Sequence, residues 1–234
     1  IHIKYSIGLL HLDRFSVPFL FVALLGLIVL FVVMKWLKNT ARVHRLMTQK
    51  VSLRFTFTKY FIVLLILSFV AQFVVTLFET VFSIYGKDEL GFNSKQLGLG
   101  FMLCGSVMAV LQPVFASYGE KFLSPKKQIA IGFLIAGVSL ITFPFFTSEF
   151  LVYGLIIMFA AGGALVTPNL LSAVSLTSKE NTGRNISIQS STGSVGQILG
   201  PVVGTWLIAD SFYYPFIIAG LIVIISIGLV RFVT

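Results

Sequence analysis

Charged residues are scarce in this sequence. Asp, Glu, Lys and Arg make up only 11% of the 234 residues, whereas 57% are hydrophobic and the mean hydropathy is +0.99. A soluble domain of this length needs far more charge to cover its surface. The apolar residues also occur in blocks that are long enough to cross a bilayer as a helix, which takes about 20 residues. This composition excludes a soluble domain and predicts an integral membrane protein.

Cysteine and histidine are also rare. Cys104 is the only cysteine, which excludes a disulfide framework and a metal site built from cysteines. The 3 histidines, His2, His11 and His44, are scattered, and the sequence contains no H-E-x-x-H motif, no pair of aspartates at membrane depth and no Ser-His arrangement at a usable spacing. We therefore expect neither an enzyme nor a bound metal or cofactor.

Seven apolar segments are long enough to span a bilayer. They lie at about residues 16–37, 60–83, 97–118, 128–147, 150–175, 187–209 and 213–231. Residues 3–12 are too short to span and are interpreted as the tail of an earlier helix. The first residue is Ile1 and no signal segment precedes the first span, so we expect the chain to be a fragment.

The basic residues are distributed unevenly between alternate loops. One set of loops holds only Lys4, Arg14, Lys87 and Lys95, and the other set holds all the remaining Lys and Arg residues, many of them between residues 35 and 59. Loops rich in Lys and Arg stay in the cytoplasm, so this bias predicts a cytoplasmic C-terminus. The net charge of +9 therefore reflects membrane topology and not binding to nucleic acid.

Loop lengths divide the chain into parts. We expect residues 1–14 to be the tail of a preceding helix and an outer loop, and residues 15–37 to be the last helix of an N-terminal bundle. Residues 38–59 form a basic cytoplasmic linker, and residues 60–234 form a six-helix C-terminal bundle. Six spans after a basic linker are typical of the second half of a transporter that is built from repeats of three helices.

One acidic residue, Glu79, falls inside an apolar segment. A carboxylate at membrane depth is costly and usually serves a proton relay, an ion site or a cationic substrate. Ser68, Gln72, Thr76, Glu79 and Ser83 are spaced so that they form one stripe on a helix. We expect this stripe to face a cavity, where desolvation would let Glu79 exchange a proton. Alternatively, Glu79 lies close enough to the outer interface to reach water.

Several other residues are candidates for a substrate site. Phe78 and Phe82 flank Glu79 in a way that suits a flat cationic ligand. The 150–175 segment is interrupted by Gly162-Gly163 and by Pro168, and the break either lines a site or is a plain kink. The proposed substrate-binding residues are Gln72, Thr76, Phe78, Phe82, Gln112 and Asn169.

The segment 187–209 combines two patterns. Gly196, Gly200 and Gly204 recur every four residues around Pro201, which predicts either tight helix packing or a hinge for gating. Its first half is rich in Ser, Thr and Gln and is interpreted as the wall of a water-accessible vestibule on the cytoplasmic side.

Three stretches carry a resemblance to a known family. The first stretch resembles the seventh span and following loop of bacterial multidrug exporters of the quinolone type in the major facilitator superfamily. It reads LFETVFSIYGKDELGFNSKQLGLGF. SYGEKFLSPKK is similar to a decayed second copy of that family's cytoplasmic loop signature, with Glu120-Lys121 at its acid-base pair. SVGQILGPVVG resembles the glycine-proline pattern of span eleven. The resemblance covers residues 15–234.

The resemblance implies an all-α membrane protein whose seven helices correspond to spans 6–12 of a twelve-span fold. It further implies a proton-coupled drug antiporter of the bacterial cytoplasmic membrane that works by alternating access and exports amphipathic, often cationic compounds. Glu79 would couple protons, and Glu120 and Lys121 would take part in gating. The partners would be lipid, protons, the substrate and the missing N-terminal half. One departure is that no acid precedes Pro168, where some of these exporters carry a second carboxylate.

Two alternatives remain open. An uptake symporter for a metabolite or sugar would have the same fold, and converging Asn, Gln and charged groups in the cavity would favour it. A complete seven-helix receptor or photoreceptor is disfavoured, because residues 213–230 contain no lysine to bind retinal and the chain starts inside an expected helix.

Overall fold

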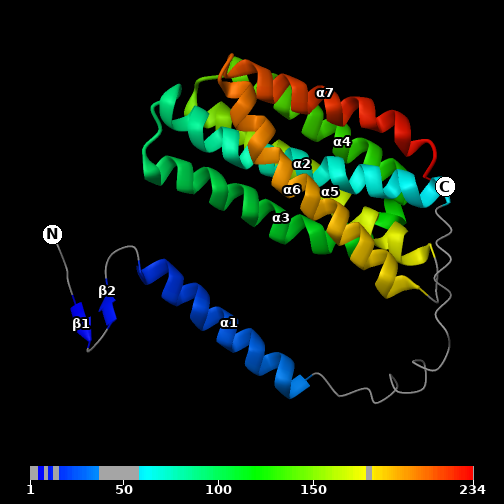
Figure 1. The fold of residues 1–234 in the computed structure, drawn as a ribbon, viewed down its shortest axis with the longest axis horizontal. Coiled ribbons are helices and arrows are strands. Elements are labelled where there is room, and N and C mark those ends of the chain that lie inside the picture. Colours follow the sequence, from blue (N-terminus) through cyan, green and yellow to red (C-terminus); the bar gives the residue numbers. More distant parts are fainter. Residues whose placement is uncertain (1–4, 8–9, 13–15, 37–57, 178–180, 234) are drawn as a thin grey trace. The chain divides into compact units, whose positions relative to one another are not determined.

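The computed structural model describes residues 5–7, 10–12, 16–36, 58–177 and 181–233 (Figure 1). The chain divides into two units, Ile1–Phe55 (unit 1) and Thr56–Thr234 (unit 2). The 38–59 linker of the sequence prediction lies almost wholly outside the described residues, which resume at Thr58.

Unit 1 contains one long helix, α1 (Ser16–Trp36), and two short strands. The strands β1 (Tyr5–Ile7) and β2 (Leu10–Leu12) pair antiparallel, with Tyr5 opposite Leu12. The predicted helix tail in residues 3–12 is therefore wrong. Apolar and polar residues alternate in both short segments, which is the period of a strand and not of a helix.

Unit 2 is a bundle of long helices. They are α2 (Lys59–Asp88), α3 (Ser94–Phe122), α4 (Pro125–Thr142), α5 (Glu149–Leu176), α6 (Thr182–Ile208) and α7 (Tyr213–Val230), with the short 3-10 turn η2 (Phe143–Phe145) continuing α4. Together with α1, one helix lies at each predicted span, so the predicted architecture of seven long helices is confirmed, and β1 and β2 are the strands among the described residues. Within unit 2, α2 packs mainly on α6, α4 packs on α5 and α7, and α3 packs on α5 (Figure 1).

Polar side chains set where two of these helices begin. Asn93 Oδ1 accepts hydrogen bonds from the backbone N–H groups of Lys95 at 2.9 Å and Gln96 at 3.1 Å, and Gln96 Oε1 accepts one from the backbone N–H of Asn93 at 2.9 Å. This capping box starts α3 a few residues before the apolar segment begins. Thr58 Oγ1 accepts from the N–H of Phe61 at 3.3 Å and starts α2 in the same way.

Glycines allow close contact between several helix backbones. A Cβ atom added at Gly132 of α4 would stand 2.7 Å from the Gly162 carbonyl oxygen of α5, and one added at Gly162 would stand 2.6 Å from the Gly132 carbonyl oxygen. The helix α5 continues through Gly162, Gly163 and Pro168 without interruption. The helix is thus not broken at Gly162, which serves the packing of α5 on α4, and a kink at Pro168 stays a prediction.

The same device joins α6 to α2. A Cβ atom at Gly196 would stand 2.7 Å from the Phe69 carbonyl oxygen, and one at Gly200 would stand 2.5 Å from that of Phe73. At Gly204 it would stand 2.9 Å from Val81 Cγ2. The structure thus places all three glycines of the predicted stripe at a tight helix contact, and α6 continues through Pro201. A hinge at this proline stays a prediction.

An aromatic core fills the end of unit 2 at which α2 finishes. The rings of Phe143 and Phe216 stack with centroids 4.8 Å apart, and Phe78 meets Phe143 edge-on at 5.4 Å. The Tyr85 ring also packs here, and its hydroxyl donates to the Pro144 carbonyl oxygen at 3.4 Å. Such aromatic contacts add to the stabilisation that burial alone provides.

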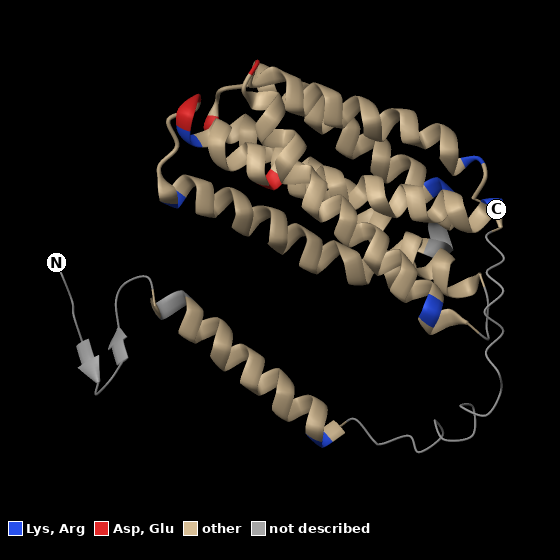
Figure 2. Ribbon diagram, viewed as in Figure 1, with Lys and Arg blue, Asp and Glu red and all other residues tan. Residues whose placement is uncertain are grey.

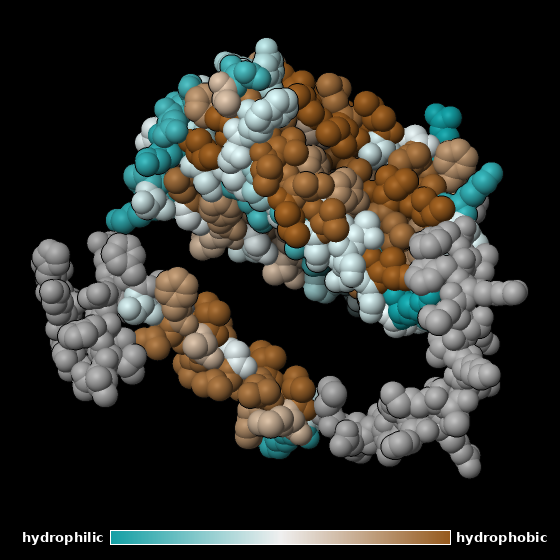
Figure 3. All heavy atoms as spheres, in the orientation of Figure 1, coloured by the Kyte–Doolittle hydropathy of each residue, from teal (hydrophilic) through white to brown (hydrophobic). Residues whose placement is uncertain are grey.

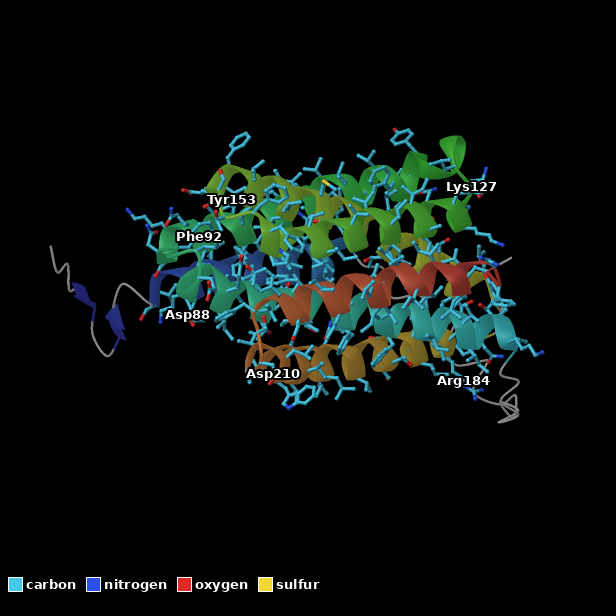
Figure 4. The ribbon with its side chains drawn as sticks, turned by 90° about the horizontal axis from the view of Figure 1, so that it is seen from above. Asp88, Phe92, Lys127, Tyr153, Arg184 and Asp210 are labelled. Carbon is cyan, nitrogen blue, oxygen red and sulfur yellow. The ribbon has the colours of Figure 1, made fainter. Side chains whose placement is uncertain are left out.

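The surface of unit 2 suits a bilayer. Apolar side chains cover the face seen in Figure 3, and most acidic positions lie at one end of the bundle, with most basic positions at the other (Figure 2). Figure 4 shows Asp88 and Asp210 at the first end and Lys127 and Arg184 at the second. Six described helices are long and apolar enough to cross a membrane, namely α1 to α5 and α7. The exception, α6, has a first half rich in hydroxyl and amide side chains.

Candidate functional site

The polar stripe predicted on α2 faces α6 along part of its length. Gln189 Nε2 of α6 donates to Ser68 Oγ at 2.9 Å, and Gln197 Nε2 donates to Gln72 Oε1 at 3.2 Å. One turn further along α2, Thr76 Oγ1 donates to the carbonyl oxygen of Gln72 at 3.0 Å. A row of side-chain amides and hydroxyls therefore runs between the two helices. The spacing of the stripe predicted that these side chains share one face of α2, but not that they bond to α6.

Glu79 continues the stripe beyond its last hydrogen bond to α6, which is made by Gln72. It lies inside α2, two turns before the end of that helix, and its side chain is exposed in this chain. Ser83 Oγ donates to the Glu79 backbone carbonyl at 2.9 Å. Within the described residues, the Glu79 carboxylate has no hydrogen-bond or ion-pair partner. A carboxylate within an apolar helix and without such a partner favours binding of a proton or a cation.

A first cavity of about 330 Å³ opens between α2, α5 and α6. Ser68 and Gln72 contribute from α2, and Thr167 contributes from α5. Four polar residues contribute from α6: Gln189, Ser190, Ser194 and Gln197. None of the described residues that line this cavity is charged, so these residues offer only neutral donors and acceptors.

A second cavity of about 160 Å³ lies between α2, α3, α4 and α5. It brings together Gln72 and Gln112, two of the predicted substrate-binding residues, with Met108, Phe159 and Thr167 beside them. Its wall is mostly apolar. Three residues line both cavities, so the two spaces adjoin one another: Ala71, Gln72 and Thr167.

Four predicted substrate-binding residues line neither cavity, and one of them is Thr76, whose hydroxyl bonds to the Gln72 carbonyl oxygen of its own helix. Phe78 and Phe82 are only 1% and 0% exposed and belong to the aromatic core, so the expectation that they face a ligand beside Glu79 is wrong. The Phe78 ring packs on Phe143 of η2, Phe159 of α5 and Phe216 of α7, and the Phe82 ring packs on Phe143 as well. Asn169 lines neither cavity. Its Nδ2 donates to Gln128 Oε1 at 3.1 Å and to the Leu165 carbonyl oxygen at 2.7 Å.

The Gln128–Asn169 pair belongs to a buried polar cluster near the turn between α3 and α4. Gln128 Nε2 donates to the Leu123 carbonyl oxygen at 2.9 Å, and a Cβ atom at Gly119 would stand 2.5 Å from Gln128 Oε1. This cluster fixes the turn that carries the predicted loop signature. The side chains of Glu120 and Lys121, the predicted gating pair, lie outside the described residues.

Sequence reasoning missed some of the polar residues at the site. Gln189 and Gln197 lie in the stretch that was interpreted as a vestibule wall, but the sequence did not show that they bond to the α2 stripe. Their signal is the eight-residue spacing, which repeats the side of α6 that holds Gly193. Gln128 carried no signal, because it follows two lysines at the start of an apolar segment. Among the described residues, no group of His, Cys, Asp and Glu could hold a metal ion.

Comparison with known proteins places this geometry in context. The model of the family described as Major Facilitator Superfamily matches residues 5–175 and 64–234. The tetracycline resistance protein, class B, of Escherichia coli is 28% identical over 219 residues, which are 84% of this chain and 54% of that protein. Multidrug resistance protein 2 of Bacillus subtilis (strain 168) is 28% identical over 174 residues, 73% of this chain and 42% of that protein.

A further relative is the quinolone resistance protein NorA of Staphylococcus aureus, which is 26% identical over 145 residues, 62% of this chain and 37% of that protein. The chain thus spans about half of the length of the first of these relatives and less of the others. A solved structure described as a bacterial homologue of the human drug peptide transporters PepT1 and PepT2 matches with a TM-score of 0.66 and 15% identity, over 73% of this chain and 41% of that one. This likeness shows a shared fold.

Proposed function

The chain belongs to the Major Facilitator Superfamily, and on that premise we propose that it is the C-terminal half of a proton-coupled antiporter that exports amphipathic, often cationic compounds. The helices α1 to α7 then correspond to spans 6–12 of a twelve-span transporter. Two bundles rock about a central site so that the site opens to one side of the membrane at a time. The other wall of the site comes from the missing N-terminal half.

Glu79 carries this proposal. Its carboxylate lies inside an apolar membrane helix, next to the polar stripe of α2, and is exposed without a hydrogen-bond or ion-pair partner among the described residues. A charged carboxylate is costly at this depth unless a cation neutralises it. A proton and a cationic substrate can therefore each occupy the position that the other leaves, which is the exchange that an antiporter needs.

The relatives support export of drugs. Their names describe resistance to tetracycline, to multiple drugs and to quinolones, and the matches cover between 62% and 84% of this chain. The charge distribution of unit 2 supports a bacterial cytoplasmic membrane with the Lys127 and Arg184 end in the cytoplasm, since Lys and Arg concentrate on that side (Figure 4). The C-terminus of the chain lies at the same end.

The proposal is tested by replacing Glu79 with Gln in the complete transporter. Everted membrane vesicles are loaded with a fluorescent cationic dye, and a pH gradient is imposed. We expect Glu79→Gln to abolish dye movement driven by the gradient while the amount of inserted protein stays the same. The matched control is Asp210→Asn, which removes an acid at the end of the bundle, outside the described helices. Gradient-driven exchange at the normal rate in Glu79→Gln would contradict the proposal.

A second candidate, uptake of a polar metabolite by symport, is favoured by one observation. The first cavity gathers the amides of Gln72, Gln189 and Gln197. These amides are better suited to binding a hydroxyl-rich compound than to binding a hydrophobic cation. The direction of transport separates the two functions. An antiporter accumulates its substrate in everted vesicles when their interior is acidified, whereas a symporter accumulates it in right-side-out vesicles when the outside is acidified.

A further inference from the structure

Basic residues from two helices meet at the end of unit 2 where the chain ends. Lys126 and Lys127 lie in the first turn of α4, and Arg231 directly follows α7. Lys126 Nζ donates to the Arg231 backbone carbonyl oxygen at 2.8 Å, which joins the start of α4 to the end of α7. A lysine is favourable there, because the last carbonyl groups of a helix carry partial negative charge. We call these three residues the α4–α7 corner.

The protein does not neutralise the charge of this corner. Within the part of the chain that the structure describes, neither the Lys127 side chain nor the Arg231 guanidinium has a hydrogen-bond or ion-pair partner, and both residues are exposed. The acids whose side chains are described lie toward the other end of the bundle or within α2 (Figure 2): Glu79, Asp88, Glu89, Glu149 and Asp210. Cations that lie close together repel one another, so the corner favours a bound anion.

Exposed apolar side chains continue from the corner along both helices. Leu134 and Val138 follow Lys127 at helical spacing, so these three exposed residues lie on one face of α4. On α7, Leu221 and Ile225 are likewise exposed and one turn apart. The helices α4 and α7 pack on each other, so their apolar faces adjoin. In a bilayer these faces lie against acyl chains.

The last turn of α7 leaves space at this surface. A Cβ atom at Gly228 would meet nothing within 4 Å, and Gly228 is exposed three residues before Arg231. Large exposed side chains, Ile225 and Phe232, stand before and after it on the same side of the chain. The missing side chain at Gly228 therefore opens a recess between them, directly beside a basic residue. An anion with an apolar tail can fill the recess and meet the charge together.

We propose that the α4–α7 corner binds the headgroup of an anionic phospholipid, with its phosphate between Lys127 and Arg231 and its acyl chains along the apolar faces of α4 and α7. A guanidinium matches the geometry of a phosphate, and basic sites between membrane helices suit such headgroups. Lys126 holds the two helix ends together. A soluble phosphate would satisfy the charges but not the adjoining apolar faces. The inference goes beyond the proposed function, because this lipid is retained and not transported.

The test locates the lipid and measures its headgroup preference at the same place. The complete transporter in detergent is irradiated with phosphatidylglycerol that carries a photoreactive group in one acyl chain, and the linked peptides are identified by mass spectrometry. Unlabelled phosphatidylglycerol or phosphatidylcholine with identical acyl chains is added as competitor. We expect the link to fall on residues 221–233. Phosphatidylglycerol should compete there at a concentration about 25-fold lower, since each of two basic side chains contributes a factor of about five.

Variants assign the preference to the corner. Lys127→Gln and Arg231→Gln should each lower the ratio of the two competing concentrations about fivefold, and the double variant should bring it close to one. The pair Lys127→Arg and Arg231→Lys keeps both charges and should keep the ratio. Arg184→Gln is the matched control, because it removes one basic residue at the same end, on the other side of the bundle in the view of Figure 4. It should leave the ratio unchanged.

Each outcome decides for or against the site. A link on helices other than α4 and α7, equal competition by the two lipids, or an unchanged ratio in the double Gln variant would refute it. So would a loss in Arg184→Gln as large as in Arg231→Gln, which would mean general surface charge. Competition by glycerophosphoglycerol, the headgroup without acyl chains, at the concentration of the lipid would mean a soluble ligand and overturn the proposal. None of these measurements involves transport, so they stand apart from the proposed function.

Discussion

Replacing Gly200 with Ala tests how closely α6 must approach α2. The added methyl carbon would stand 2.5 Å from the Phe73 carbonyl oxygen and 2.9 Å from the Leu77 backbone nitrogen, and it would also overlap Thr76 Oγ1. Carbon atoms seldom approach these atoms so closely, and two of the three belong to the backbone. The side chain of Thr76 could turn away, but the two helices would still have to separate.

The expected loss follows from two opposing terms. Overpacking a tight contact costs about 1–3 kcal/mol, and the better helix propensity of Ala offsets about 1 kcal/mol of this. The net destabilisation is then at most about 2 kcal/mol, which lowers the melting temperature of a domain of this size by up to about 8 °C. The measurement is thermal unfolding of the purified protein in detergent, followed by circular dichroism.

Gly228→Ala is the matched control, because a Cβ atom at Gly228 of α7 would meet nothing within 4 Å. It should leave the melting temperature unchanged or raise it slightly. The double variant Gly200→Ala with Thr76→Ala should recover only a small part of the loss, since the Phe73 and Leu77 backbone contacts remain. If Gly200→Ala melts together with Gly228→Ala, the reasoning from close backbone contact is refuted.

Two further predictions concern stability. Asn169→Leu should lower the unfolding free energy by about 1–3 kcal/mol, because it removes a donor from the buried Gln128 oxygen. A double-mutant cycle with Gln128→Leu should then give a coupling energy of at least about 0.5 kcal/mol, and additive losses would mean that the two amides are independent. Phe78→Ala should cost about 3–5 kcal/mol, because Phe78 is only 1% exposed. Phe145→Ala, at a side chain that is 62% exposed, should cost much less, and similar melting temperatures for both would contradict the aromatic core.

The helices could be predicted from the sequence, since blocks of apolar residues separated by charged or turn residues leave few alternatives for a chain in lipid. Even the weakly apolar α6 (Thr182–Ile208) was predicted as one of the seven apolar segments, at residues 187–209. The error in residues 5–7 and 10–12 came from length alone, as the alternation of polar and apolar residues pointed to strands. The helix α5 continues through Gly162, and this glycine packs against α4. The sequence of one helix does not reveal such a contact with another helix.

The site could be predicted only in part. The stripe of α2 placed Gln72 and Glu79 on the polar side of the helix, because its spacing repeats the helical period. Phe78 and Phe82 were assigned to the site by their closeness to Glu79 in sequence, but both rings are buried in the aromatic core. Asn169 was assigned by its closeness to Pro168, and its true partner, Gln128, lies on another helix. Such pairings depend on tertiary packing, which the spacing within one segment cannot give.

The polar first half of α6 also bears on how the chain is made. A segment so rich in hydroxyls and amides is poorly suited to leave the translocon alone, since each unpaired amide in hydrocarbon is costly. Ser68 and Gln72 belong to α2, which is synthesised and inserted before α6. They therefore offer hydrogen-bond partners to Gln189 and Gln197 when α6 enters the bilayer. The order of the helices along the gene thus lets α6, the least hydrophobic of them, enter the bilayer in contact with α2, which was inserted earlier.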